Sequence, residues 1–261
     1  MAQDKPKRGI QSVEIGGALL GALAEAEGPL HLGDLARRAG LSPAKAHPYL
    51  VSFGHLGLIV QERVSGRYDF GPLALGIGLA ALRRLNPLQA ALAGLADLVA
   101  ATGHTGAIAV WGSHGPTVVH IHESDRPLHV NLRVGSVMSL RNTATGRIFA
   151  AHMPEGSIAA ALAREGASDS RAIGGLADGD ATLAETNAQA RIRGLACVVD
   201  FPIPGISALS APVFDHTGAL TLAMTLLGPT GVFDARPDGP VATMLLERTR
   251  ALSRRLGGQK Q

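Results

Sequence analysis

The sequence predicts an α+β protein, with an N-terminal winged helix-turn-helix, a helical linker and a C-terminal antiparallel sheet flanked by helices. Three observations support this prediction. Residues 15–56 contain short segments with an apolar residue every three or four positions, the period of an amphipathic helix. Beyond residue 103, several segments alternate as half-buried strands do. Between these regions lies a helical stretch that Asn86-Pro87 interrupts.

The run from Leu32 to His47 is the most informative motif. Apolar residues at positions 32, 35, 36 and 39 form one face of a short helix, and Gly40 can end that helix in the left-handed conformation. Ser42 and Pro43 are typical N-cap and first-turn residues of a second helix. The pattern predicts a helix-turn-helix, whose second helix enters a major groove of DNA. A helical hairpin without DNA-binding function would share it.

A helix before this motif and a hairpin after it complete a winged helix. Ile15, Leu19, Leu23 and Ala26 recur at helical spacing. Residues 56–62 predict a helix exit into a strand, residues 64–66 a turn, and residues 67–70 a return strand. The alternative is a small α+β subdomain with an ordinary surface hairpin.

We place the domain boundaries after residues 71 and 87. Residues 1–71 form the winged helix, residues 72–87 the helical linker, and residues 88–261 the second domain. A further helix is expected over residues 87–101.

The second domain shows six candidate strands and three candidate helices. The strands are expected over residues 105–111, 117–122, 128–132, 195–199, 207–214 and 219–227. The helices are expected at about 155–165, 180–193 and 240–256.

Composition excludes several classes of protein. Aromatic residues make up only 3% of the chain, so Ala, Leu, Val and Ile must build the cores. The single cysteine, Cys197, excludes an intrachain disulfide and a cysteine-rich zinc site and fits a reducing cytoplasm. No export signal or membrane span is predicted, so we expect a cytoplasmic protein.

The net charge of +3 does not single out the first domain, because residues 1–70 hold eight basic and seven acidic side chains. The placement of the basic residues is more informative than their number. Residues 5–8 form a basic arm, a feature that is more often a solvated tail than a groove reader.

Several motifs follow one another in a specific order over about 200 residues. They are Gln11-Ser12-Val13, residues 35–42, residues 67–73, Gly135 with residues 142–147, Arg193-Gly194, and residues 211–218. With these motifs the chain resembles the IclR family of bacterial transcriptional regulators nearly end to end. The resemblance implies an operator-binding winged helix and a GAF/PAS-like domain that binds a small carboxylate effector. It also implies homodimers or dimers of dimers that repress or activate operons for the catabolism of small organic and aromatic acids.

Two groups of side chains are expected to contact double-stranded operator DNA. On the second helix of the motif, Lys45 is expected to contact guanine or phosphate, and Ala44 a thymine methyl. On the wing, two arginines are expected to reach phosphates. The predicted set is Ser42, Ala44, Lys45, His47, Arg63 and Arg67. An exposed face without a partner is the alternative.

Pro48 departs from the family's pattern, which commonly has a helix-compatible polar residue here. An interior proline removes a backbone hydrogen bond and clashes with the carbonyl of Ala44. We therefore expect either a bend in this helix or a helix that effectively begins near Ala46.

The resemblance places the effector site against the sheet. The predicted residues are Asn142, Thr143, Ala144, Thr145, Asp200, Ser207, Ala208 and Thr225. Ala144 and Thr145 are expected at a helix start, where backbone N–H groups can hold a carboxylate. The alternatives are helix capping alone for Asn142 and Thr145, and a solvated loop position for Asp200.

No metal, cofactor or catalytic residue is predicted. His120 and His122 share one strand face, but the sequence offers no matched third ligand. Nucleophile-elbow, Walker and dinucleotide-binding motifs are absent from the sequence. The competing reading is a GAF-like small-molecule-binding enzyme or sensor without sequence-specific DNA binding.

Overall fold

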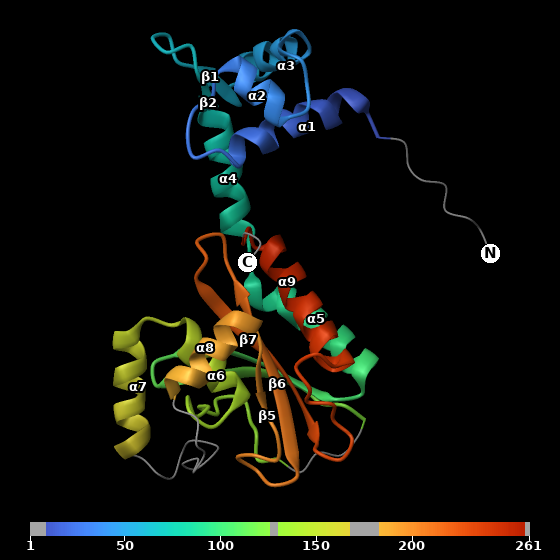
Figure 1. Cartoon of the computed structure of the whole chain (residues 1–261), viewed down its shortest axis with the longest axis vertical. Coiled ribbons are helices and arrows are strands. Elements are labelled where there is room, and N and C mark those ends of the chain that lie inside the picture. The colour runs from blue at the N-terminus through green and yellow to red at the C-terminus, as the bar shows by residue number, and fades with distance from the viewer. Residues whose placement is uncertain (1–8, 126–129, 168–182, 259–261) are drawn as a thin grey trace, which may run out of the picture. The chain divides into compact units, whose positions relative to one another are not determined.

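The computed structural model describes residues 9–125, 130–167 and 183–258. The chain divides into two compact units, Met1–Leu85 and Asn86–Gln261 (Figure 1). The basic arm at residues 5–8 lies outside the described residues. Within the described part, no helix combines the length and the apolarity that a membrane span requires.

The first unit is the predicted winged helix. Its elements are α1 (Gln11–Ala24), α2 (Leu32–Arg38), α3 (Pro43–Leu56), β1 (Ile59–Gln61), β2 (Tyr68–Phe70) and the linker helix α4 (Pro72–Arg84). Leu19, Leu35, Leu50 and Ile59, one from each of α1, α2, α3 and β1, are at most 2% exposed and meet in a single apolar core. This core fixes α3 against the rest of the unit.

The turn between α2 and α3 forms as the sequence predicts. Gly40 adopts a φ of +69°, in the left-handed region that other residues rarely enter. The Ser42 side chain then accepts a hydrogen bond from the Lys45 backbone N–H at 3.3 Å, which caps α3. The sequence did not indicate a bridge between Leu30 and Tyr68, which adds an isolated backbone pair beside the wing.

Pro48 lies inside a continuous helix. Because α3 begins at Pro43, the expectation that the helix effectively starts near Ala46 is wrong. Pro48 has no N–H to donate to the Ala44 carbonyl, and both residues are exposed. Solvent can therefore hydrate that carbonyl. The Ser52 hydroxyl donates to the Pro48 carbonyl at 2.9 Å one turn later.

We expect Pro48→Ala to stabilise α3 by up to about 3 kcal/mol, because it restores one backbone hydrogen bond and removes a steric clash. Amide hydrogen exchange of peptides that cover α3 measures this change locally. His47→Ala, at an exposed neighbouring position, is the matched control. Faster exchange in Pro48→Ala than in the parent would show that the helix accommodates the proline ring without strain.

The second unit contains a five-stranded antiparallel sheet in the order β4-β3-β7-β6-β5. Its strands are β3 (Thr105–Gly112), β4 (Gly115–His122), β5 (Ala196–Val198), β6 (Ile206–Phe214) and β7 (Leu220–Pro229). Its helices are α5 (Pro87–Thr102), α6 (Ala144–His152), α7 (Glu155–Ala167), α8 (Leu183–Arg193) and α9 (Pro240–Arg255). The antiparallel sheet with flanking helices is the predicted architecture.

The prediction of a strand over residues 128–132 is wrong for residues 130–132, the part that the structure describes. Residues 126–129 lie outside the described residues, and Val130, Asn131 and Leu132 have no strand structure. Val130 and Leu132 are half-buried and line a cavity, whereas Asn131 is exposed. The alternation therefore reflects one face turned toward the cavity rather than pairing in the sheet.

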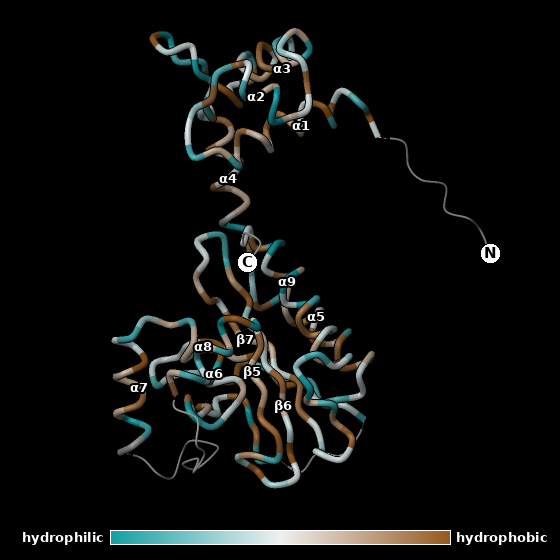
Figure 2. Tube along the Cα trace, in the orientation of Figure 1, coloured by the Kyte–Doolittle hydropathy of each residue, from teal (hydrophilic) through white to brown (hydrophobic). Residues whose placement is uncertain are grey.

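Alternate residues of each strand cover opposite faces of the sheet. Ile108, Leu209 and Leu226 belong to an apolar cluster with α5 and α9. Ala109 and Ala223 belong to a second cluster, with α6, α7 and α8. Figure 1 shows α5 and α9 together on one side of the sheet and α6 to α8 on the other, and Figure 2 shows hydrophobic residues along the strands between them. The sheet is thus buried on both faces.

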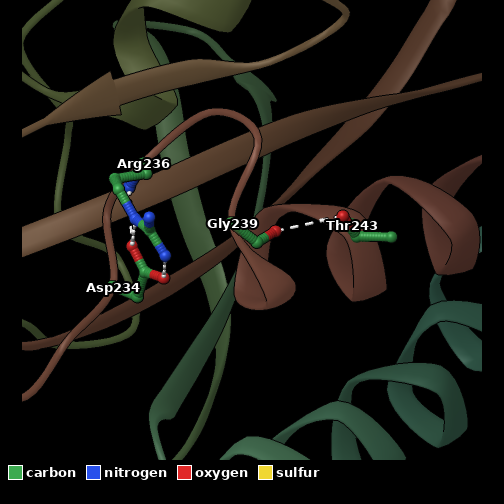
Figure 3. A network of polar contacts seen from close by, with 4 residues as sticks. All are labelled: Asp234, Arg236, Gly239 and Thr243. Atoms are coloured by element: carbon green, nitrogen blue, oxygen red, sulfur yellow. Dashed lines mark hydrogen bonds and ion pairs between the residues drawn. The ribbon is translucent and has the colours of Figure 1, made fainter.

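The entry into α9 is held by a short polar network (Figure 3). The Arg236 guanidinium donates to both carboxylate oxygens of Asp234, at 2.9 and 2.8 Å. These contacts with Arg236 lower the pKa of Asp234 to about 2. The Thr243 hydroxyl donates to the Gly239 carbonyl at 3.0 Å, which closes the first turn of α9.

Candidate DNA-binding face and ligand cavity

The second helix of the helix-turn-helix, α3, has one buried and one exposed face. Ala46 and Leu50 are at most 2% exposed and face the core. Ala44, Lys45 and His47 are exposed on the other side of the helix. The predicted contact residues of α3 therefore lie together on the surface of a helix that Ser42 caps.

The wing carries its two arginines in different surroundings. Arg63 lies in the exposed turn, next to Val64, which is 96% exposed. Arg67 donates through Nε to the His31 ring at Nε2, over 3.3 Å. Because a guanidinium only donates, the His31 Nε2 atom is the acceptor in this contact. Sequence reasoning missed His31, which orients Arg67 from the residue just before α2.

A cavity of about 60 Å³ lies against the α6 side of the sheet. Its walls are almost entirely apolar. Five of the predicted effector residues line it: Thr143, Ala144, Thr145, Ala208 and Thr225. Sequence reasoning missed most of the apolar wall, which includes Met138, Val198, Phe201, Pro202, Ile203 and Ile206. The alternation of apolar and polar residues over 130–132 was the one signal in the sequence for this wall.

The threonine hydroxyls in the cavity wall already have partners. Thr145 and Thr225 share a hydrogen bond of 2.8 Å between their hydroxyl oxygens. Thr225 then donates to the Ser210 hydroxyl at 2.9 Å, and Ser210 donates to the Met224 carbonyl at 3.3 Å. This chain satisfies the buried hydroxyls internally, so they do not by themselves require a ligand.

The start of α6 provides the polar part of the cavity. The Thr143 hydroxyl donates to the Ser139 carbonyl at 2.8 Å and accepts from the Gly146 N–H at 2.9 Å. The N–H groups of Ala144 and Thr145 have no hydrogen-bond partner among the described residues. Two backbone donors at the positive end of a helix dipole thus remain available beside an apolar cavity.

Close packing holds the start of α6 in place. A Cβ atom on Gly146 would overlap the Ser139 carbonyl, so only glycine allows this approach. Glu165 of α7 accepts hydrogen bonds from the Ser139 hydroxyl and from the Leu140 N–H, the latter at 3.1 Å. The segment that precedes α6 is therefore fixed by α7 as well as by α6.

Three of the predicted effector residues do not line the cavity. Asn142 is 1% exposed, and its N–H donates to the Ser139 hydroxyl at 3.1 Å. Asp200, at a φ of +54°, accepts from the Gly205 N–H at 2.5 Å. The Ser207 hydroxyl is within 3.0 Å of the Thr230 hydroxyl. These contacts hold together loops that border the cavity.

The histidines on β4 do not form a metal centre with other described side chains. The rings of His120 and His122 lie 6.4 Å apart on one strand face. Among the described residues, no group of three or more His, Cys, Asp and Glu side chains is placed to hold an ion. Cys197 is half-buried, and its burial raises the pKa of the thiol.

Comparison with known proteins places both units in one family. Residues 12–63 match the family model described as the IclR helix-turn-helix domain. Residues 79–254 match the model described as bacterial transcriptional regulator IclR C-terminal. Together the two matches cover the helices of the helix-turn-helix and nearly all of the second unit.

Individual relatives match over almost the whole chain. The glycerol operon regulatory protein of Streptomyces griseus is 32% identical over 255 residues, which cover 96% of this chain and 98% of the relative. The transcriptional repressor IclR of Escherichia coli K12 is 24% identical over 96% of this chain and 92% of its own. The crystal structure of Pseudomonas aeruginosa HmgR superimposes with a TM-score of 0.85 at 38% identity, covering 97% of this chain and 100% of that one.

Proposed function

Because the chain belongs to the IclR family of bacterial transcriptional regulators, we propose that a small effector in the sheet cavity controls operator binding by α3 and the wing. The chain is a DNA-binding regulator with an effector-binding C-terminal domain, not an enzyme. We assign DNA binding to residues 1–71, linkage to residues 72–87 and effector binding to residues 88–261. We propose that the protein acts in the cytoplasm. We also propose that it is a repressor, because the Escherichia coli relative is named a transcriptional repressor.

The observation that carries the proposal is the exposed face of the capped helix α3. Lys45 and His47 project from it, and the wing adds Arg63 and Arg67. Helix N-terminal side chains read base edges in the major groove, while arginines of a wing contact phosphates. We assign base contacts to Ala44, Lys45 and His47 and phosphate contacts to the wing arginines, with Ser42 at the helix cap.

Selection of duplexes from a random DNA pool by the purified full-length protein tests this assignment. The proposal predicts enrichment of a palindromic or pseudo-palindromic sequence whose affinity falls steeply with salt, because bound phosphates release counterions. Recovery of unrelated sequences, with equal affinity for every duplex, would contradict sequence-specific binding.

For the effector we propose a small organic carboxylate, aromatic acids included. The free N–H groups of Ala144 and Thr145 can hold a carboxylate, and the apolar walls can hold its hydrocarbon part. Thr143, Thr145, Ala208 and Thr225 complete the proposed contact set, while Asn142, Asp200 and Ser207 support the surrounding loops.

A thermal-shift panel separates this class of effector from neutral ligands. Acetate, pyruvate, benzoate and phenylacetate represent small carboxylates. Glycerol represents the neutral class, because one relative is named for a glycerol operon. A ligand that binds the native state stabilises it by RT ln(1 + [L]/Kd), so the melting temperature rises with the ligand concentration relative to Kd. A shift with glycerol alone would contradict the carboxylate assignment.

We further propose that the protein acts as a homodimer or dimer of dimers, through the linker helix α4. Leu73, Leu75, Ile77 and Leu79 of this helix are between 44% and 64% exposed in the single chain. A helix that exposes several large apolar residues requires a covering surface. Pairing of two linker helices would supply that surface and would bring two α3 helices to a two-fold symmetric operator.

Leu75→Glu is expected to dissociate this assembly, because it would place a carboxylate in an apolar interface. Operator affinity should then fall by about 100-fold, as each subunit binds one half-site alone. Analytical ultracentrifugation measures the assembly, and fluorescence anisotropy measures the affinity for the selected duplex. Ala81→Glu, at an exposed position of the same helix, is the control. An unchanged sedimentation coefficient for Leu75→Glu would place the interface elsewhere.

A further inference from the structure

A second cavity, of about 380 Å³, lies at the edge of the sheet in the second unit. Strand β5 pairs with β6 only from Ala208 to Ser210, so β6 runs beyond its neighbour toward Phe214. The end of α8 and the last turns of α9 border the space that this leaves. This cavity shares no lining residue with the effector cavity.

Four arginines line this cavity, and no acidic residue does. Arg191 and Arg193 come from the last turn of α8, and Arg250 and Arg254 come from α9. Arg191 is held in place by a hydrogen bond from Nε to the Ala151 carbonyl. The side chains of the other three have no hydrogen-bond or ion-pair partner among the described residues.

All four arginines are exposed, so the repulsion among their positive charges is modest and is strongest at low salt. Arg250 and Arg254 are four residues apart on one face of α9, where like charges repel. A cation in the last turn of a helix interacts favourably with the helix dipole. This interaction explains the presence of Arg193 at the end of α8 and of Arg254 at the end of α9, each considered alone. This interaction with the helix dipole does not explain why the ends of two helices and Arg250 meet in one cavity that no carboxylate lines.

The geometry points to a binding site for a small ligand that carries two or more phosphate groups. Guanidinium groups bind phosphate oxygens in pairs of parallel hydrogen bonds, so four of them suit several phosphate oxygens. A single carboxylate would offset only one of the four charges. The volume is within the usual range for a small-molecule site.

The floor of the cavity is apolar, which suits the carbon part of such a ligand. Pro212, Phe214 and Leu246 form this floor. Pro212 has no N–H, and the Phe214 N–H donates to the Ser253 hydroxyl at 3.0 Å. Neither residue offers a free edge donor to an added β-strand, so a small ligand fits this part of the edge better than a peptide strand does.

This inference does not depend on the proposed effector, because the two cavities are separate. Calorimetric titration of the full-length protein with inorganic pyrophosphate, without divalent metal and at low salt, tests it. We expect saturable binding, and we expect the double substitution Arg193→Gln and Arg250→Gln to weaken it by about tenfold or more, since charge-assisted hydrogen bonds are lost.

The matched control is the double substitution Arg164→Gln and Arg255→Gln. It removes the same charge at exposed positions outside the cavity, one of them on α9. Pyrophosphate affinity near that of the parent in this control supports the site. Equal weakening in both double variants would show general charge attraction and would overturn the proposal. Absence of pyrophosphate binding by the parent would overturn it too. If the parent does not bind pyrophosphate and the double substitution Arg193→Gln and Arg250→Gln dissociates its oligomer, the four arginines belong to a subunit interface.

Discussion

Deletion of residues 1–85 is expected to abolish operator binding and to leave residues 86–261 folded. The two units have separate apolar cores, one around Leu35 and Leu50 and the other around the five-stranded sheet. The exposed face of α3 and both wing arginines are lost with the first unit. Fluorescence anisotropy with the selected duplex measures binding, and circular dichroism reports the fold of the remainder. Tight, sequence-specific binding by residues 86–261 would contradict the assignment.

The full-length variant Lys45→Ala serves as the companion to the deletion. Lys45 is exposed, and only its backbone contributes to the cap, so the fold should be unaffected. If Lys45 contacts phosphate, affinity should fall and the salt dependence should decrease by about one unit of slope. If it contacts guanine instead, discrimination at one base pair should relax by about 1–3 kcal/mol. Unchanged affinity and sequence preference would exclude Lys45 from the interface.

Ala208→Leu is expected to abolish effector binding. Ala208 lies on β6 and lines the cavity, which is only about 60 Å³ in volume. Three added carbon atoms would occupy much of that space, at a cost in stability of typically about 1–3 kcal/mol if the surrounding residues must shift. Calorimetry with the carboxylate identified in the thermal-shift panel measures the loss.

Ala219→Leu is the control for this substitution. Ala219 is exposed in the turn between β6 and β7, where the same added volume meets solvent. It should bind the effector as the parent does. If Ala208→Leu also binds with the parent's affinity while remaining folded, the effector site is not the cavity beside α6.

The sequence predicted the fold best where local chemistry alone decides the structure. Ser42 caps α3 and Gly40 ends the preceding helix for reasons contained in three or four residues. The strands that bury alternate residues on both faces of the sheet were also found, since their period is local. The winged helix and the antiparallel sheet follow from such signals.

The errors concern residues whose roles depend on distant segments. Val130 and Leu132 alternate like a strand, but they turn toward a cavity rather than pairing with a neighbour. Pro48 is tolerated inside α3, because Ala44 is exposed and solvent can hydrate the carbonyl that receives no N–H from Pro48. In both cases the tertiary environment decides, and no local pattern contains it.

The candidate sites show the same limit. The start of α6 was expected beside the cavity from the family's pattern, and Thr143 caps it there. The loop at residues 201–203 closes the cavity wall without any periodic signal in the sequence. Arg193 and Arg250 are far apart in the chain, and only the folded sheet edge brings them into one cavity.

Control of DNA binding by the effector is measured as the operator affinity of the full-length protein with and without the identified effector. Binding at the two sites should be coupled, with a change in operator affinity of about 5- to 150-fold and an equal change in effector affinity when operator is present. Ala208→Leu should bind the operator and show no response to the effector. If the parent binds effector and operator and neither ligand changes the affinity for the other, the cavity does not control DNA binding.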